Sequence, residues 1–202
     1  QWNNESDFFS LNNDTVIKIL YLKKSKKDKF KKSIEIKLDV LNESLRKIPL
    51  FNLEDTLTYF PKIDWLNKDT FKFEHKNHIY HVSFESELYC VSVLEFPENA
   101  TNKDYNFQKN ILAYTIEDNL YIANTDNIKL KINPDKNEKN IIYGQAVHRY
   151  EFGIYKGTFW SPNGAKMAFY RKDESKVDDY PIISVLDTTT ISNTIKYPMS
   201  SD

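Results

Sequence analysis

Short runs of apolar and aromatic residues, separated by polar turns, make up most of the chain. Ile34, Ile36 and Leu38 alternate with polar residues, as expected for a half-buried β-strand. Polar residues between two such runs predict hairpin turns at residues 12–14, 76–77 and 118–119. The pattern therefore predicts an all-β fold built from antiparallel strands.

One segment departs from the strand pattern and predicts a single short helix at residues 40–47. Leu41, Leu45 and Ile48 recur at the spacing of one helix face. Asp39 precedes this run, and its carboxylate is the expected N-cap because aspartate is a preferred capping residue.

A hairpin pattern occurs twice in the middle of the chain. Residues 71–82 and 112–123 each hold an apolar run, a polar turn and a second run. Aligning Phe71 with Leu112 places Phe73 on Tyr114, Ile79 on Leu120 and Tyr80 on Tyr121. A third copy begins at Phe159. An aromatic residue marks the start of each unit, namely Trp2, Trp65, Phe107 and Trp160.

Repeats of this kind predict a β-propeller. Repeats of roughly 40–60 residues made of short strands suit the blades of a propeller, which bury their faces against one another. The chain holds about three to four such units, whereas closed rings usually have about four to eight blades. We therefore expect a partial propeller over residues 1–202, with a ring that continues beyond Asp202.

Charge and glycine content exclude several classes of function. Lys and Arg together number 28 and Asp and Glu 29, so the net charge is −1. A nucleic-acid partner is therefore not expected, because such proteins need a basic surplus. The first 143 residues contain no glycine, so a phosphate-binding loop is not expected there. We expect no cofactor and no metal.

Three features could carry chemistry, and a structural interpretation is favoured for each. The lysine-rich residues 23–32 could bind a polyanion, but such charge blocks usually mark solvated hairpin tips. His75, His78 and His81 could bind a metal, but on a hairpin His78 and His81 would face opposite sides. Cys90, the single cysteine, lies in an apolar run and is interpreted as a buried, inert thiol.

No serine in the chain has the surroundings of a hydrolase nucleophile. The Gly-x-Ser-x-Gly pattern is absent, and Ser161 begins the turn-forming sequence SPNG. Glycosylation triplets at Asn4, Asn13, Asn42 and Asn99 are expected by chance in a chain so rich in asparagine. A catalytic triad within this chain is therefore not expected.

The most informative segment is a polar excursion at residues 143–157, framed by glycines and followed by a blade start. Glu151 lies between Tyr150 and Phe152. A carboxylate held by aromatic residues is a candidate ligand for an ammonium group. The alternative is an exposed glutamate paired with Arg149, since surface ion pairs are common and weak.

This segment resembles the propeller of the dipeptidyl peptidase IV branch of the prolyl oligopeptidase family, bacterial dipeptidyl and prolyl tripeptidyl peptidases included. The resemblance is carried by residues 147–153 (VHRYEFG) and residues 160–164 (WSPNG). It is strong over residues 140–200 and looser before them. It implies that Glu151 binds the free amino terminus of a peptide substrate, with supporting roles for His148, Arg149 and Tyr150. Dipeptidyl peptidase IV uses an acidic pair, and Tyr150 departs from that pattern, so release of dipeptides or tripeptides stays open.

The resemblance also implies what kind of protein contains this chain. It would be the non-catalytic, gating part of a secreted or periplasmic serine exopeptidase that cuts after Pro. The catalytic residues would lie in a C-terminal α/β-hydrolase domain of the same protein, and a homodimer is a further option. The alternative is a non-enzymatic propeller scaffold that binds proteins or glycans.

Overall fold

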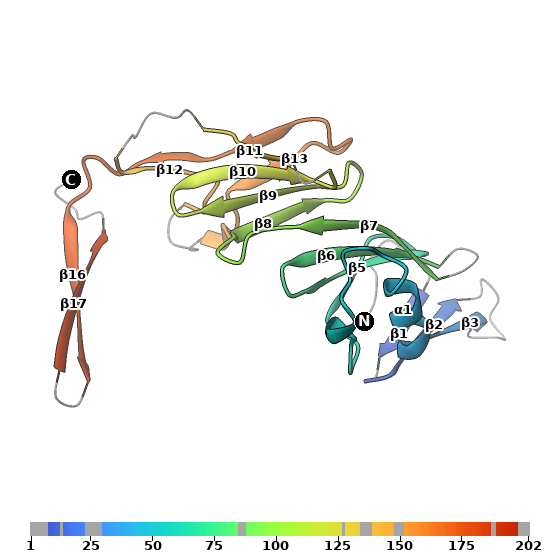
Figure 1. Cartoon of the computed structure of the whole chain (residues 1–202). Helices are drawn as coiled ribbons and strands as arrows, with labels where there is room; N and C mark the ends of the chain where they lie inside the picture. The colour runs from blue at the N-terminus through green and yellow to red at the C-terminus, as the bar shows by residue number, and fades with distance from the viewer. Residues whose placement is uncertain are drawn as a thin grey trace. The chain divides into compact units, whose positions relative to one another are not determined.

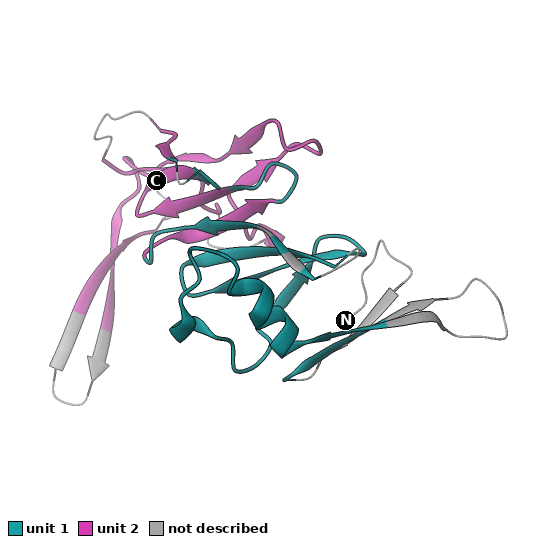
Figure 2. Cartoon of the chain, turned by 45° about the vertical axis from the view of Figure 1, so that its right-hand side comes forward, with its two compact units in different colours: residues 1–98, 107–111, 123–128 teal, residues 99–106, 112–122, 129–202 magenta. Residues whose placement is uncertain are grey.

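A computed structural model of the chain consists mainly of β-strands (Figure 1). It describes residues 8–12, 14–22, 30–84, 88–126, 128–133, 139–147, 152–186 and 189–197. The chain divides into two compact units, which are described separately below (Figure 2). The first comprises residues 1–98, 107–111 and 123–128, and the second comprises residues 99–106, 112–122 and 129–202.

The first unit contains two antiparallel sheets and the helix. The three-stranded sheet has the order β1-β2-β3, with β1 at Phe8–Asn12, β2 at Val16–Leu22 and β3 at Phe30–Lys37. Helix α1 at Leu38–Leu45 and the short 3₁₀ helix η1 at Leu53–Asp55 follow. The four-stranded sheet runs β4 (Ile63–Trp65), β5 (Thr70–His75), β6 (His78–Ser83) and β7 (Tyr89–Glu95) in sequence order.

The later strands form a second four-stranded sheet and three pairs. The sheet contains β8 (Thr101–Asn106), β9 (Ile111–Ile116), β10 (Asn119–Asn124) and β11 (Lys129–Lys131), again as sequential neighbours. The antiparallel pairs join β12 (Ile141–Tyr143) to β15 (Arg171–Asp173), β13 (Thr158–Trp160) to β14 (Met167–Phe169), and β16 (Asp179–Leu186) to β17 (Thr189–Lys196). Four-stranded meanders of this kind are the blades of propellers. The predicted all-β, partial-propeller fold with one short α-helix is thus confirmed over the described part of the chain.

Each unit has its own hydrophobic core. In the first unit, aromatic residues of β5 and β6 pack with Leu41 and Leu45 of α1, which are fully buried. In the second unit, Ala113 and Leu120 pack with Ile141 and Tyr143. Among the described residues, no helix has the length and apolar character needed to cross a bilayer.

Helix α1 is confirmed, but its start and its cap were predicted wrongly. It begins at Leu38, two residues before the predicted start, and its N-cap is Lys37, which makes no capping hydrogen bond through its side chain. The carboxylate of Asp39 instead accepts a hydrogen bond from the adjacent amide of Val40 at 2.8 Å. The helix starts early because β3 runs directly into it, and the Leu38 amide donates to the carbonyl of Thr15 at 2.9 Å. Leu38 therefore belongs to the helix and not to the strand of Ile34 and Ile36.

The internal repeat is confirmed at the level of ring packing. Phe73 stacks on Tyr80 with ring centroids 5.0 Å apart and an angle of 14° between the ring planes. The aligned pair, Tyr114 and Tyr121, stacks at 5.6 Å with the same angle of 14°. The third copy does form a hairpin, β13–β14, but within the described residues that hairpin is a two-stranded sheet and not part of a four-stranded one.

All three predicted hairpins form, one with its turn at the predicted residues and two with the turn shifted by one residue. Lys76 and Asn77 connect β5 and β6, as predicted. The first turn lies between Asn12 and Val16, with Asn13 outside the described residues. The third turn is at Glu117 and Asp118, one residue earlier than predicted, because Asn119 already begins β10. The first residues of the two described two-residue turns share one backbone conformation, with φ of 50° at Lys76 and 51° at Glu117.

Candidate functional site

The predicted site residues His148, Arg149, Tyr150 and Glu151 lie outside the described residues. Their proposed roles therefore stay predictions. The chain on both sides is described, up to Val147 and again from Phe152. Described residues on both sides hold the two ends of this segment.

The two ends of residues 145–157 meet at their backbones. A Cβ atom added to Gly157 would lie 2.3 Å from the carbonyl carbon and oxygen of Gln145, so only glycine permits this approach. The Gly144 amide donates to the Tyr170 carbonyl, and the Tyr170 amide donates to the Gly157 carbonyl, both at 2.9 Å. Tyr170 therefore bridges Gly144 and Gly157, so the two ends of residues 145–157, called the loop below, are held together at this base.

A side chain supports the first end of this loop. The amide nitrogen Nε2 of Gln145 donates to the carbonyl of Glu117 at 2.7 Å. Gly144 next to it has a φ of +70°, and a Cβ there would lie 2.7 Å from Cδ1 of Leu120. The first end is therefore attached to the turn between β9 and β10.

Asp104 on β8 holds the second end. Its carboxylate accepts hydrogen bonds from Oγ1 of Thr158 at 2.8 Å and from Nζ of Lys156 at 3.1 and 3.3 Å. Its backbone carbonyl accepts from Nε1 of Trp160 at 3.2 Å. Lys156 also lies over the ring of Phe159, with Nζ 5.5 Å from the centroid. One residue of β8 thus contacts three alternate residues of the chain that leaves the loop.

The blade-start sequence after β13 forms a turn, as predicted. The Ser161 hydroxyl donates to Oδ1 of Asn163 at 2.9 Å and accepts from the Lys166 amide at 3.0 Å. Gly164 has a φ of +66°, and its carbonyl accepts a hydrogen bond from Nδ2 of Asn106 at 3.1 Å. The Ser161 hydroxyl therefore serves the turn.

The histidines and the cysteine of the first unit are embedded in its sheet. His81 is buried, its Nδ1 lies 3.3 Å from Oδ1 of Asn110, and burial lowers its pKa below 6.5. Burial likewise lowers the pKa of His75. Cys90 is half-buried, its thiol donates to the Ser92 carbonyl at 3.3 Å, and burial raises its pKa to about 12. The prediction of an inert thiol agrees with this raised pKa, because the thiolate is the nucleophilic form.

The remaining sequence features give no further site. In the part of the chain that is described, no three His, Cys, Asp or Glu residues gather in a way that could hold a metal ion. Of the lysine-rich residues 23–32, only the last three are described, at the start of β3. Asn42 is buried, and its side-chain amide bonds to both backbone groups of Leu57.

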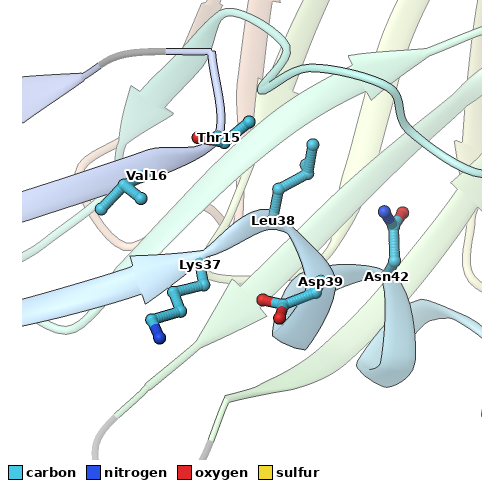
Figure 3. A pocket seen from close by; sticks show the side chains of 6 residues that line it. All are labelled: Thr15, Val16, Lys37, Leu38, Asp39 and Asn42. Carbon is cyan, nitrogen blue, oxygen red and sulfur yellow. The ribbon is translucent and has the colours of Figure 1, made fainter.

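Described residues of the first unit line two cavities. One of about 380 Å³ lies at the start of α1 and is lined by Thr15, Val16, Lys37, Leu38, Asp39 and Asn42 (Figure 3). Figure 3 shows Leu38 and Lys37 pointing to opposite sides of the chain. The other, of about 320 Å³, is lined by Tyr59, Lys62, Glu74 and His75 among others, beside an ion pair between Lys76 and Asp55. Neither cavity includes a residue of the predicted site.

Comparison with known protein families identifies the chain. The family described as the dipeptidyl peptidase IV (DPP IV) N-terminal region matches residues 67–202. That match spans most of the chain and includes the whole loop with its base. The chain belongs to the DPP IV N-terminal region family.

Proteins similar to this chain are named dipeptidyl aminopeptidases. Dipeptidyl-aminopeptidase B of Phaeosphaeria nodorum is 32% identical over 94 residues, which are 43% of this chain and 10% of the relative. The corresponding protein of Talaromyces marneffei is 32% identical over 78 residues, which are 37% of this chain and 9% of the relative. A Bacteroides ovatus protein assigned as a dipeptidyl aminopeptidase IV has a crystal structure that matches 98% of this chain, with a TM-score of 0.73 and 30% identity. This DPP IV-type chain spans only 26% of that protein.

The contacts that hold the two ends of residues 145–157 could not be predicted from the sequence. Asp104 lies more than 50 residues before its partners, and no local pattern connects them. Gly157 did carry a signal, because a glycine between Lys156 and a β-like run marks a close backbone approach.

Proposed function

We propose that this chain is the N-terminal part of the propeller of a serine exopeptidase that releases dipeptides or tripeptides from peptide N-termini, after Pro. Its own role would be to gate access and to bind the free amino terminus through Glu151. The observation that carries the proposal is the DPP IV-type family match, which includes residues 145–157. The nucleophile would belong to a C-terminal α/β-hydrolase domain of the same protein, located in the periplasm or outside the cell.

In the proposed mechanism, Glu151 contributes by positioning and not by bond making. Its carboxylate holds the substrate ammonium at a set distance from the nucleophile, so only short N-terminal pieces reach it. The fixed base of the loop supports this role, because Gln145 and Gly157 are in backbone contact. Holding a reacting group in place from a rigid base lowers the entropic part of the barrier.

The substitution Glu151→Gln in the full-length protein tests the proposal. It should lower kcat/KM for peptides with a free amino terminus, because it removes a charge-assisted hydrogen bond worth about 1.5–3 kcal/mol. At 1.4 kcal/mol per factor of ten, that is roughly a 10- to 150-fold loss. The measurement is kcat/KM for a free proline-containing peptide substrate and for its Nα-acetylated form.

The acetylated substrate is the control. It lacks the ammonium group, so the wild type should cleave it poorly and the substitution should change its kcat/KM little. An equal fractional loss for both substrates would mean that Glu151 supports the fold and does not bind the amino terminus.

A second candidate function is a binding scaffold for proteins or glycans. It is favoured by exposed aromatic side chains next to the predicted site, where Phe152 is 83% and Tyr155 is 72% exposed. Full-length protein without measurable turnover of any proline-containing dipeptide or tripeptide substrate would favour this alternative.

A further inference from the structure

We propose that the cavity of about 320 Å³ in the first unit is a binding site for a neutral sugar, taken as a single hexose unit. Two stretches of chain form its walls, residues 56–62 after η1 and residues 74–76 at the turn between β5 and β6. Its volume lies at the lower end of the range for small-molecule sites, which suits one sugar ring. The site includes no residue of the predicted amino-terminus site and does not depend on the proposed exopeptidase function.

The two walls are held in place by an ion pair and by hydrogen bonds. Asp55, which is largely buried just before the first wall, pairs with Lys76 of the second wall. Asn42 of α1 bonds to the amide and the carbonyl of Leu57 in the first wall, at 3.0 and 2.9 Å. The cavity is therefore formed before a ligand arrives, which lowers the entropic cost of binding.

The charges around the cavity balance and favour a neutral ligand. Lys62 and Glu74 line it, and Lys76 in the same lining is paired with Asp55. A lysine ammonium can only donate hydrogen bonds, and an ionised carboxylate can only accept them. A hydroxyl group does both, so a ligand with several hydroxyl groups can bond to the cations and to the anions of such a lining.

His75 contributes an acceptor that a ligand hydroxyl group could satisfy. Burial lowers the pKa of His75, so the ring is neutral at pH 7, although a hydrogen bond to the Asp55 backbone raises that pKa. The bond to Asp55 uses the N–H group of the ring. Nε2 is buried, has no hydrogen-bond partner among the described residues, and therefore carries a lone pair. Because His75 lines the cavity, a small rotation of its ring would bring Nε2 to a ligand hydroxyl group.

Tyr59 gives the cavity an aromatic surface. Its side chain lines the cavity and is 64% exposed, so its ring is accessible. A tyrosine combines a large apolar face, which can cover the C–H groups of a sugar ring, with a hydroxyl group at its edge. Donors, acceptors and an aromatic ring in one cavity favour a sugar over an inorganic ion.

The experiment measures the binding of sugars to the full-length protein by saturation-transfer NMR and calorimetry. The probes are the methyl glycosides of glucose, galactose, mannose and N-acetylglucosamine, with maltotetraose and cellotetraose to represent the ends of glycan chains. Sodium acetate and methylammonium chloride test for an ion site. We expect a Kd of about 1 mM for at least one sugar, the range open to so small a ligand, and no binding of either ion. Binding is measured directly, because concentrated sugars stabilise folded proteins in general.

Three variants place the sugar in this cavity, and a fourth is the matched control. Glu74→Gln should raise the Kd about tenfold, as for one charge-assisted hydrogen bond, and Tyr59→Ala should raise it by a similar factor. Both side chains are exposed, so folding is not at risk. His75→Phe removes the buried acceptor and should raise the Kd about fivefold. Glu98→Gln makes the same change at an exposed position of the first unit outside the cavity and should leave the Kd unchanged.

Two kinds of result would overturn the proposal. The first is the absence of binding by every sugar, whether or not acetate or methylammonium binds. The second is sugar binding with an unchanged Kd in both Glu74→Gln and Tyr59→Ala, since the sugar would then bind elsewhere on the protein. Cleavage of peptides should be the same in all four variants, so either result would leave the proposed exopeptidase function standing.

Discussion

At the scale of single residues, Gly157 and Gly153 of the loop are glycines for two different physical reasons. A side chain does not fit at position 157, because its Cβ atom would collide with the Gln145 backbone. Gly153 has open space around it but a φ of +74°. Residues other than glycine adopt this backbone conformation only at a cost in free energy. The pair therefore allows crowding and backbone strain to be compared within one loop.

We predict that Gly157→Ala destabilises the protein more than Gly153→Ala. The first change forces backbone atoms apart, a form of overpacking that costs about 1–3 kcal/mol or more. The second should cost about 1–2 kcal/mol, the usual price of a left-handed conformation. Urea unfolding of both variants measures the difference. A Gly157→Ala variant as stable as the wild type would mean that the two ends of the loop do not meet as described.

We also predict that buried histidines make the protein less stable in mild acid. Burial lowers the pKa of His81 and of His75 below the value of 6.5. The unfolded chain therefore takes up protons first as the pH falls, so stability is complete above about pH 6.5 and declines below it. The measurement is the free energy of unfolding between pH 8 and pH 5. The double variant His75→Gln, His81→Gln should show a shallower decline, and an unchanged slope would contradict the prediction.

At the scale of elements, periodic features could be predicted from the sequence and helix boundaries could not. Leu41 and Leu45 revealed α1 because a buried helix face repeats at a fixed interval. Its start did not follow from Asp39, because the Leu38 amide finds its partner in Thr15, a tertiary contact. The turn at Glu117 was misplaced because Asn119 is the better turn former, whereas the chain places Glu117 in the left-handed conformation.

Asn42 connects α1 to the segment after η1 and gives a prediction at this scale. Its Nδ2 donates to the Leu57 carbonyl at 2.9 Å, and its Oδ1 accepts from the Leu57 amide at 3.0 Å. Asn42→Ala should cost about 2–4 kcal/mol, because it leaves two buried backbone groups unpaired. The control is Asn67→Ala, which removes one exposed bond to the Asp69 amide and should cost less than about 1 kcal/mol. Equal melting temperatures of the two variants would refute the assignment.

At the scale of the whole molecule, the blade repeat could be predicted from the sequence, but the strand pairing of its third copy could not. Phe73 and Tyr114 occupy matching positions, and aromatic spacing carried that signal. In the third copy, residues 144–157 separate β12 from β13, and each of these strands pairs with a different partner. Of the candidate site, sequence motifs indicated the loop, whereas the contacts of Asp104 depend on the tertiary fold.

The chain by itself should show no peptidase activity. Ser161, the serine of the blade-start motif, has its hydroxyl engaged in a turn. The chain also spans only 26% of the Bacteroides ovatus protein that it resembles. The measurement is turnover of proline-containing chromogenic dipeptides and tripeptides by the purified chain. Activity that survives repurification and disappears when a residue of this chain is substituted would contradict the prediction.

The sequential order of strands in both four-stranded sheets also bears on how the protein is made. Each strand from β5 to β7, and from β9 to β11, pairs with the strand synthesised just before it. Pairing between chain neighbours closes short loops and is fast. Each sheet can therefore assemble as it leaves the ribosome. Strand β12 is different, because Ile141 pairs with Asp173 and must wait until β15 has been synthesised. The base of the loop, which needs Gly144 beside Tyr170, is accordingly a late product of folding.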